Sequence, residues 1–294
     1  MEYVIETNGL VKRYGDKFAV NQASVHVKKG DIYGLIGKNG AGKTTLMKLL
    51  LGLARPNSGE IKLFGGGDLN KARKRIGSLI EAPALYKNET AFENMKRFSY
   101  LAPTSDDEIK RLLDLVGLGN TGAKKVGAFS LGMKQRLGLA VALLGSPEML
   151  ILDEPINGLD PAGIKEVRNL IAELNGKGIT FMISSHILDE LGKIATTYGI
   201  ARDGVLEEIS AEEVKNRCRT MLKIVADDTM LAAEVLKEKF PELTFGIENG
   251  AVCVHDFSED ASVINRALVN AGVGVYELKS EGIEFEDYFI ERLG

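Results

Sequence analysis

The amino-acid sequence predicts an α/β protein with a mixed-sheet core and a helical subdomain, followed by a small second α/β domain. Three observations predict this fold: compact apolar runs typical of buried strands, helical patterns between them, and a change in the order of elements near Ser210. The length of 294 residues fits about two domains. We expect the first domain at residues 1–216, with its helical subdomain at about 84–144, and the second domain at 217–294.

The elements of the first domain follow from apolar periodicity and from helix caps. Short apolar runs indicate strands, and a capping residue before an amphipathic pattern indicates a helix. Asp160, for example, can cap a helix that has Pro161 in its first position. The predicted strands are residues 4–11, 23–27, 32–36, 60–64, 76–80, 149–152 and 179–184, and the predicted helices include 44–51, 131–144 and one that Ser105 caps and Gly117 ends.

The second domain is predicted from the order strand, helix, strand, strand, helix, strand. This order is typical of a ferredoxin-like α/β sandwich. The two middle strands form a hairpin that turns at Asn249 and Gly250. The other elements are strands at 221–226 and 273–278 and helices at 230–239, 260–271 and 284–293.

Composition argues against two classes of protein. The 37 Lys and Arg residues against 41 Asp and Glu residues give a net charge of −4, so we expect no nucleic-acid partner. The longest uncharged stretch, residues 137–147, is far short of the roughly 20 residues that a membrane helix needs. Any membrane spans must therefore belong to another polypeptide. We see no secretory signal at Met1 and expect a cytoplasmic protein.

The strongest local motif is a glycine-rich loop between a predicted strand and a predicted helix. Its backbone N–H groups can turn toward phosphate oxygens, and the helix N-terminus adds positive potential. Lys43 can reach the β- and γ-phosphates, the Thr44 hydroxyl can ligate Mg²⁺, and Thr45 can donate to the α-phosphate. The loop consists of Gly37, Lys38, Asn39, Gly40, Ala41, Gly42, Lys43, Thr44 and Thr45.

Polar groups that suit nucleotide chemistry follow three further predicted strands. Asp153 and Glu154 end one apolar run, where Asp153 can hold Mg²⁺ opposite Thr44 and Glu154 can act as a general base for water. His186 follows a strand that we expect beside the Asp153 strand, so it can hydrogen-bond a γ-phosphate. Tyr14, on the loop after the first strand, can stack on adenine, although a surface aromatic is the simpler interpretation.

A second anion site is predicted at Ser130, where a helix opens shortly before the Asp153 strand. Ser130 and the N–H groups after it form a helix N-terminus directed at an anion. One chain cannot easily bring this site and the glycine-rich loop to the same nucleotide. The sequence therefore predicts that two copies share each nucleotide. The segment reads Ser130, Leu131, Gly132, Met133, Lys134 and Gln135.

These motifs, in this order, resemble those of the nucleotide-binding subunits of ABC transporters. The resemblance covers residues 1 to about 216 and includes Asp160. It implies an ATPase that uses ATP and Mg²⁺ and forms a head-to-tail homodimer. Each ATP would lie between the glycine-rich loop of one copy and Ser130 and Gly132 of the other. Separate transmembrane permease subunits would hold the dimer at the inner face of the cell membrane.

Two positions depart from the family pattern. The signature Leu-Ser-Gly-Gly-Gln keeps its serine and second glycine here but changes elsewhere, since it reads Phe129, Ser130, Leu131, Gly132, Met133. The loop after the strand at 76–80 normally carries a glutamine that touches Mg²⁺ and the attacking water, and here it carries Glu81. Glu81 is therefore either an anionic Mg²⁺ ligand with a catalytic role or a solvated linker residue.

Both departures, with the short second domain, resemble the bacitracin-resistance and lantibiotic-immunity branch of ABC ATPases. Members of that branch work with separate membrane subunits to move membrane-active peptides away from the cell. The main alternative interpretation is an exporter subunit with the same domain organisation but another substrate. A soluble ABC ATPase acting on ribosomes or DNA is disfavoured by the single cassette and by the lack of a basic surplus. A small-molecule phosphoryl transferase would give no role to Ser130.

Overall fold

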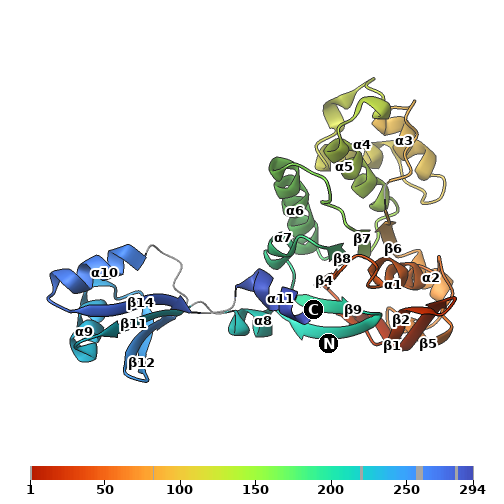
Figure 1. Cartoon of the computed structure of the whole chain (residues 1–294). Coiled ribbons are helices and arrows are strands. Elements are labelled where there is room, and N and C mark those ends of the chain that lie inside the picture. The colour runs from red at the N-terminus through yellow and green to blue at the C-terminus, as the bar shows by residue number, and fades with distance from the viewer. Residues whose placement is uncertain (1, 82, 219–220, 256–260, 282–283, 294) are drawn as a thin grey trace. The chain divides into compact units, whose positions relative to one another are not determined.

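The computed structural model describes residues 2–81, 83–218, 221–255, 261–281 and 284–293 (Figure 1). Its contacts divide the chain into two compact units, Met1–Ala211 with Leu293, and Glu212–Arg292. Each unit has an apolar core of its own. The boundary expected after residue 216 lies within the helix α8 (Ala211–Arg217).

The first unit is built around a six-stranded sheet with the order β10-β9-β4-β8-β7-β6. Neighbouring strands are parallel except β9 and β10, which form a hairpin, so the predicted mixed sheet is confirmed. Strands β4, β7 and β8 are buried along their whole length, because this sheet is covered on both faces. The strands are β4 (Ile32–Gly37), β6 (Ile76–Leu79), β7 (Met149–Asp153), β8 (Thr180–Ser185), β9 (Thr197–Arg202) and β10 (Val205–Ser210).

A smaller antiparallel sheet contains the N-terminal strands. Here β1 (Tyr3–Tyr14) pairs with β2 (Lys17–Ala23), β3 (His26–Lys28) and β5 (Ser58–Leu63). The prediction of a single strand at residues 23–27 was wrong, because these residues contain the end of β2 and the start of β3. Strand β2 was missed since most of its first half is exposed, which weakens the apolar pattern.

The helix α1 (Lys43–Leu50) packs against strands of both sheets, namely β2, β4 and β7. Its apolar side chains join the core of the first unit; they are Leu46, Met47, Leu49 and Leu50. This packing fixes the N-terminus of α1 at the carboxyl ends of the parallel strands. Ligands in open α/β sheets bind at this edge.

The helical subdomain gathers α3, α4 and α5 on one side of the first unit (Figure 1). Thr90 and Glu93 form a capping box at the start of α3, and Ser105 caps α4 as predicted. Helix α5 also packs against β6, which joins the subdomain to the main sheet. The helices of this unit, apart from α1, are α2 (Leu69–Arg73), α3 (Ala91–Phe98), α4 (Asp106–Leu115), α5 (Leu131–Ala142), α6 (Pro161–Gly176) and α7 (Leu188–Gly192), with short 3-10 turns η1 (Gly119–Thr121) and η2 (Val126–Ala128).

The second unit contains a four-stranded antiparallel sheet with the order β12-β13-β11-β14. Helix α9 packs on β11 and β13, and α10 packs on β14. This is the strand–helix order predicted for a ferredoxin-like sandwich, although Asp260 of the predicted helix lies outside the described residues. The elements are β11 (Met221–Ala226), α9 (Thr229–Lys239), β12 (Thr244–Glu248), β13 (Ala251–His255), α10 (Ala261–Asn270), β14 (Val275–Glu281) and α11 (Phe285–Leu293).

Among the helices of the described ranges, none combines the length and the apolarity that crossing a membrane would require.

Candidate functional site

The glycine-rich loop joins the end of β4 to the start of α1, in the strand–loop–helix context that the sequence predicts. Gly42 has φ +105°, and a Cβ at this position would lie 1.9 Å from the carbonyl oxygen of Ala19. Only glycine fits this turn. No side chain among the described residues caps α1, so its first N–H groups are left for an anion.

Lys43 is the buried cation of this loop, at 6% exposure. Its ammonium group donates to the carbonyl oxygens of Gly37 at 2.6 Å and Lys38 at 3.3 Å, and it lies 3.9 Å from Glu154 Oε1. Burial lowers the pKa of Lys43, and the charges of Glu154 and Asp153 act in the opposite direction. The loop therefore holds a positive charge close to the place where phosphates would bind.

Asp153 connects α1 to two strands of the main sheet. Its Oδ2 accepts a hydrogen bond from Thr44 Oγ1 at 2.7 Å, and its Oδ1 accepts one from Ser184 Oγ at 2.5 Å. Asp153 and Ser184 are partners in the parallel register of β7 and β8. Mg²⁺ prefers oxygen ligands and usually takes one or two carboxylates from the protein and the rest from phosphates and water. Thr44 and Asp153 thus fit a magnesium ion that binds together with a nucleotide.

Glu154 contacts both the cation of the loop and the predicted histidine. One carboxylate oxygen lies 2.7 Å from His186 Nδ1, and the other lies 3.9 Å from Lys43 Nζ. Its backbone has φ +50°, which is uncommon outside glycine, and its N–H donates to Ser184 Oγ at 2.9 Å. The predicted adjacency of the two strands that precede Glu154 and His186 is confirmed, since β7 pairs with β8.

Lys43, Asp153 and Glu154 line a cavity of about 280 Å³, which we call the loop cavity, whereas His186 does not line it. Gly37 and Lys38 do not line it but supply the carbonyl groups that hold Lys43. Lys17 was missed by the sequence analysis because β2, the strand that carries it, was missed. The lining residues are Lys17, Ala19, Asn39, Gly40, Ala41, Gly42, Lys43, Thr44, Thr45, Asp153 and Glu154.

Tyr14 is the last residue of β1 and pairs with Lys17 in the hairpin to β2, so its predicted place on a loop was wrong. The sequence pattern hid this because β1 continues three residues past its predicted end at residue 11. Tyr14 is 54% exposed, the centre of its ring lies 4.9 Å from Lys12 Nζ, and the residue does not line the loop cavity. Stacking on adenine stays a prediction, which rests on the exposed ring.

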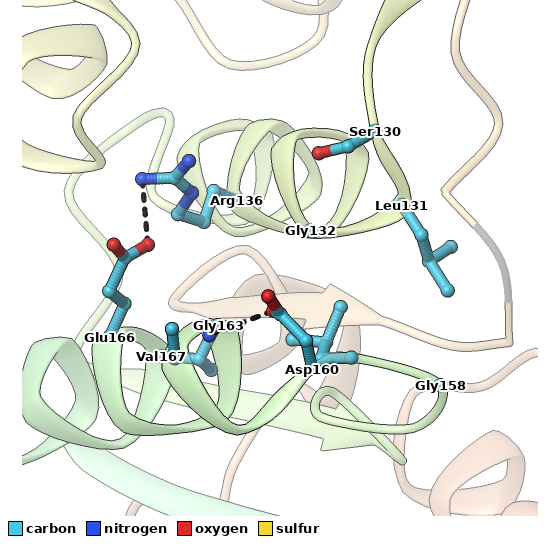
Figure 2. Close-up of a pocket in the computed structure, with 11 residues that line it drawn as sticks. Ser130, Leu131, Gly132, Arg136, Gly158, Asp160, Gly163, Glu166 and Val167 are labelled. Carbon is cyan, nitrogen blue, oxygen red and sulfur yellow. Dashed lines mark hydrogen bonds and ion pairs between the residues drawn. The ribbon is translucent and has the colours of Figure 1, made fainter.

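Ser130 and Gly132 line a second cavity of about 360 Å³, where the N-termini of α5 and α6 meet (Figure 2). We call it the Ser130 cavity. Ser130 Oγ caps α5 by accepting from the Met133 N–H at 3.2 Å, and Asp160 caps α6, as predicted, by accepting from the Gly163 N–H at 3.0 Å. Two helix N-termini at one cavity favour an anion. The lining residues are Ser130, Leu131, Gly132, Arg136, Gly158, Leu159, Asp160, Ala162, Gly163, Glu166 and Val167.

Arg136 and Glu166 line the Ser130 cavity as an ion pair, with Arg136 Nη1 at 3.1 Å from Glu166 Oε2 (Figure 2). The pair links α5 to α6. The pair could not be predicted from the sequence, because the two residues are 30 positions apart and carry no shared motif.

The two cavities share no lining residue. The structure therefore brings most of the predicted residues together in two groups, and Tyr14, Glu81 and His186 line neither cavity. Lys43, Thr44, Asp153 and Glu154 belong to the loop cavity. Ser130, Gly132 and Asp160 belong to the other, and none of them lines the loop cavity.

Glu81 follows β6 and contacts a cation of α1. Its Oε1 accepts a hydrogen bond from Lys48 Nζ at 2.7 Å, and its side chain is 66% exposed. The hydrogen bond to Glu81 raises the pKa of Lys48. Glu81 does not line the loop cavity. Both of its possible roles, metal ligand and linker residue, stay predictions.

Comparison with known proteins identifies the family. The sequence pattern of the family described as ABC transporter matches residues 20–157. The chain is 40% identical to a bacitracin transport ATP-binding protein of Enterococcus faecalis, over 100% of this chain and 97% of that protein. This chain belongs to the ABC transporter ATP-binding proteins. A lantibiotic transport ATP-binding protein of Streptococcus pyogenes is 46% identical, over 68% of this chain and 88% of that protein.

Solved structures support the assignment of this chain to the ABC transporter ATP-binding proteins. A nucleotide-free ATP-binding cassette from an ABC transporter superposes with a TM-score of 0.67 at 26% identity, over 74% of this chain and 94% of that one. The ADP conformation of another such cassette gives the same TM-score at 27% identity, over 74% and 94%. The predicted family, cassette fold and ATPase activity are therefore confirmed.

Gly42→Ala is expected to weaken nucleotide binding by about tenfold or more, because the loop must rearrange around the new Cβ and relieve the strain at φ +105°. Titration with a fluorescent ATP analogue measures this. Gly176→Ala, where a Cβ meets nothing within 4 Å, is the control and should bind like the wild type. Wild-type binding by Gly42→Ala would contradict the prediction.

Proposed function

We propose that this ATPase works as a head-to-tail homodimer that holds two ATP molecules in its interface and powers a separate permease for peptide antibiotics. The observation that carries the proposal is that one chain has two cavities at helix N-termini and that these cavities share no lining residue. The loop cavity offers the N-terminus of α1 and Lys43. The Ser130 cavity offers the N-termini of α5 and α6.

A symmetric pair of chains can complete both sites at once. In such a pair, the loop cavity of one copy faces the Ser130 cavity of the other, and symmetry makes two equal sites. The γ-phosphate would be the group that both copies contact. ADP lacks that group, so ATP favours the closed dimer and hydrolysis favours the open one.

Thr44 and Asp153 are the residues proposed to hold Mg²⁺ together with the phosphates. Their oxygen atoms are 2.7 Å apart, and the hydrogen bond from Ser184 keeps the Asp153 carboxylate oriented. When bound, the ion would neutralise charge on the phosphate oxygens. Glu81 is the further candidate ligand, but its carboxylate is paired with Lys48.

Glu154 is the proposed general base for the attacking water. It lies between Lys43, which would hold the β- and γ-phosphates, and His186. A carboxylate in that place can accept a proton as water attacks the γ-phosphorus. His186 would then hydrogen-bond the γ-phosphate through its other ring nitrogen. We assign Thr45 to the α-phosphate and Tyr14 to adenine.

Peptide antibiotics are the proposed cargo because of the relatives that the chain resembles. The bacitracin transport protein matches the whole chain, so the similarity includes the second unit as well as the cassette. The lantibiotic transport protein matches about two thirds of the chain at higher identity. In this role the protein would sit at the cytoplasmic face of the cell membrane, bound to permease subunits that supply the spans.

Glu154→Gln is expected to bind ATP normally and to hydrolyse it roughly 10²–10⁴-fold more slowly, because an amide cannot accept the proton. An ATP-bound dimer should accumulate, which size-exclusion chromatography with light scattering would measure. Glu173→Gln is the matched control, since Glu173 is an exposed carboxylate in the last turn of α6 that pairs with Lys177. Unchanged turnover in Glu154→Gln would refute its role as the base.

Two inactive variants are expected to restore activity when they are mixed. Lys43→Ala disables the loop cavity, and Ser130→Glu places a negative charge in the other cavity. In a mixed dimer, one shared site contains neither change, so turnover should return to about a quarter of the wild-type rate. Steady-state phosphate release measures it, with each variant alone as the control. A mixture as inactive as its components would argue against the shared site.

Cells that rely on this protein are expected to become more susceptible to bacitracin or to a lantibiotic when it is replaced by Glu154→Gln. Minimum inhibitory concentrations of both peptides measure this, and an antibiotic that acts on the ribosome is the control. Unchanged susceptibility to both peptides would refute the proposal that peptide antibiotics are the cargo. Co-sedimentation with ribosomes or DNA in place of a membrane protein would favour the rival function.

A further inference from the structure

Lys48 occupies a place that no part of the proposed reaction uses. It lies on α1 one helical turn after Thr44, so the two residues share a face of the helix. Its ammonium group donates to Glu81 Oε1 at 2.7 Å. Lys48 is therefore a cation that is paired with Glu81 and lies on the same face of α1 as Thr44, which is proposed to hold Mg²⁺.

The sheet brings Glu81 to the same edge as the other acids. Leu79 at the end of β6 pairs with Leu152 of β7, so the chain leaves β6 where Asp153 ends β7. Glu81 then has φ +62°, a conformation that non-glycine residues adopt only when their surroundings hold them. Asp153 and Glu154 line the loop cavity, and Glu81 adds a third carboxylate at the same edge of the sheet, outside the lining of the cavity. Such a concentration of negative charge opposes the binding of another anion.

We propose that Lys48 is a positioning residue that holds the Glu81 carboxylate at this edge and offsets its negative charge beside the nucleotide. A neutral glutamine in place of Glu81 would need no such cation. The pair thus accounts for how the chain tolerates a glutamate in this loop. The inference rests on the proposed binding of ATP in the loop cavity.

The effect of Lys48 on ATP binding should depend on whether Mg²⁺ is present. In Lys48→Met, the Glu81 charge is no longer offset, so ATP without a metal should bind about two- to fivefold more weakly. With Mg²⁺ present, the metal takes over the neutralisation and the loss should be smaller. The ratio of the two dissociation constants, without and with Mg²⁺, should therefore rise in Lys48→Met.

Calorimetric titration with a non-hydrolysable ATP analogue, in EDTA and in Mg²⁺, measures this ratio without turnover. Lys48→Arg keeps the charge and should behave like the wild type. In Lys48→Met combined with Glu81→Gln, the ratio should return to that of Glu81→Gln alone, because no carboxylate remains to offset. Lys177→Met removes a cation from a pair of the same kind, with Glu173, and should change nothing.

The outcomes separate this inference from the proposed function. An equal loss for Lys48→Met in the Glu81→Gln background would show that Lys48 acts on the nucleotide independently of Glu81, which overturns the proposal. An unchanged ratio in Lys48→Met would overturn it as well. If instead Lys43→Ala binds the analogue as tightly as the wild type does, the proposed use of the loop cavity fails, independently of Lys48.

Discussion

The contact on which the site depends is the pair of hydrogen bonds that Asp153 accepts from Thr44 and Ser184. Thr44 opens α1, Asp153 ends β7, and Ser184 lies on β8, so one carboxylate joins a helix to two strands. The parallel alignment of β4, β8 and β7 makes this possible, because the carboxyl ends of these strands lie at one edge of the sheet. The packing of α1 between the two sheets then holds the glycine-rich loop at that edge.

Backbone strain is found at the edge of the main sheet where the parallel strands end. Glu81 and Glu154 follow neighbouring parallel strands, and both have positive φ angles although neither is glycine. Each carboxylate is paired with cationic or imidazole groups from other elements, Lys48 in one case and Lys43 with His186 in the other. Such conformations persist only where surrounding contacts hold them, and they cluster at functional sites. The two acids are thus held in place by the fold rather than by local preference.

The groups proposed to contact one nucleotide also lie in two separate cavities of the chain. The loop cavity holds the buried cation and the acids, and the Ser130 cavity holds two helix N-termini with their caps intact. Three changed side chains in the Ser130 signature leave the serine cap and the backbone N–H groups in place. A helix N-terminus attracts anions through its backbone, so this part of the site tolerates unusual side chains.

Much of the fold and of the site could be predicted from local sequence patterns. The glycine-rich loop, the Asp153 strand, the start of a helix at Ser130, the cap at Asp160 and the order of the second unit depend on residues within a few positions of each other. Strand β2 and the end of β1 were misjudged, because an exposed edge weakens the apolar alternation. Only the tertiary structure decided the contacts between distant residues, which include Lys48 with Glu81 and Arg136 with Glu166. The sequence already predicted that Ser130 and the glycine-rich loop form separate sites. The tertiary structure decided which residues line each cavity, since the neighbours of a residue across a parallel sheet are set by strand order and not by sequence distance.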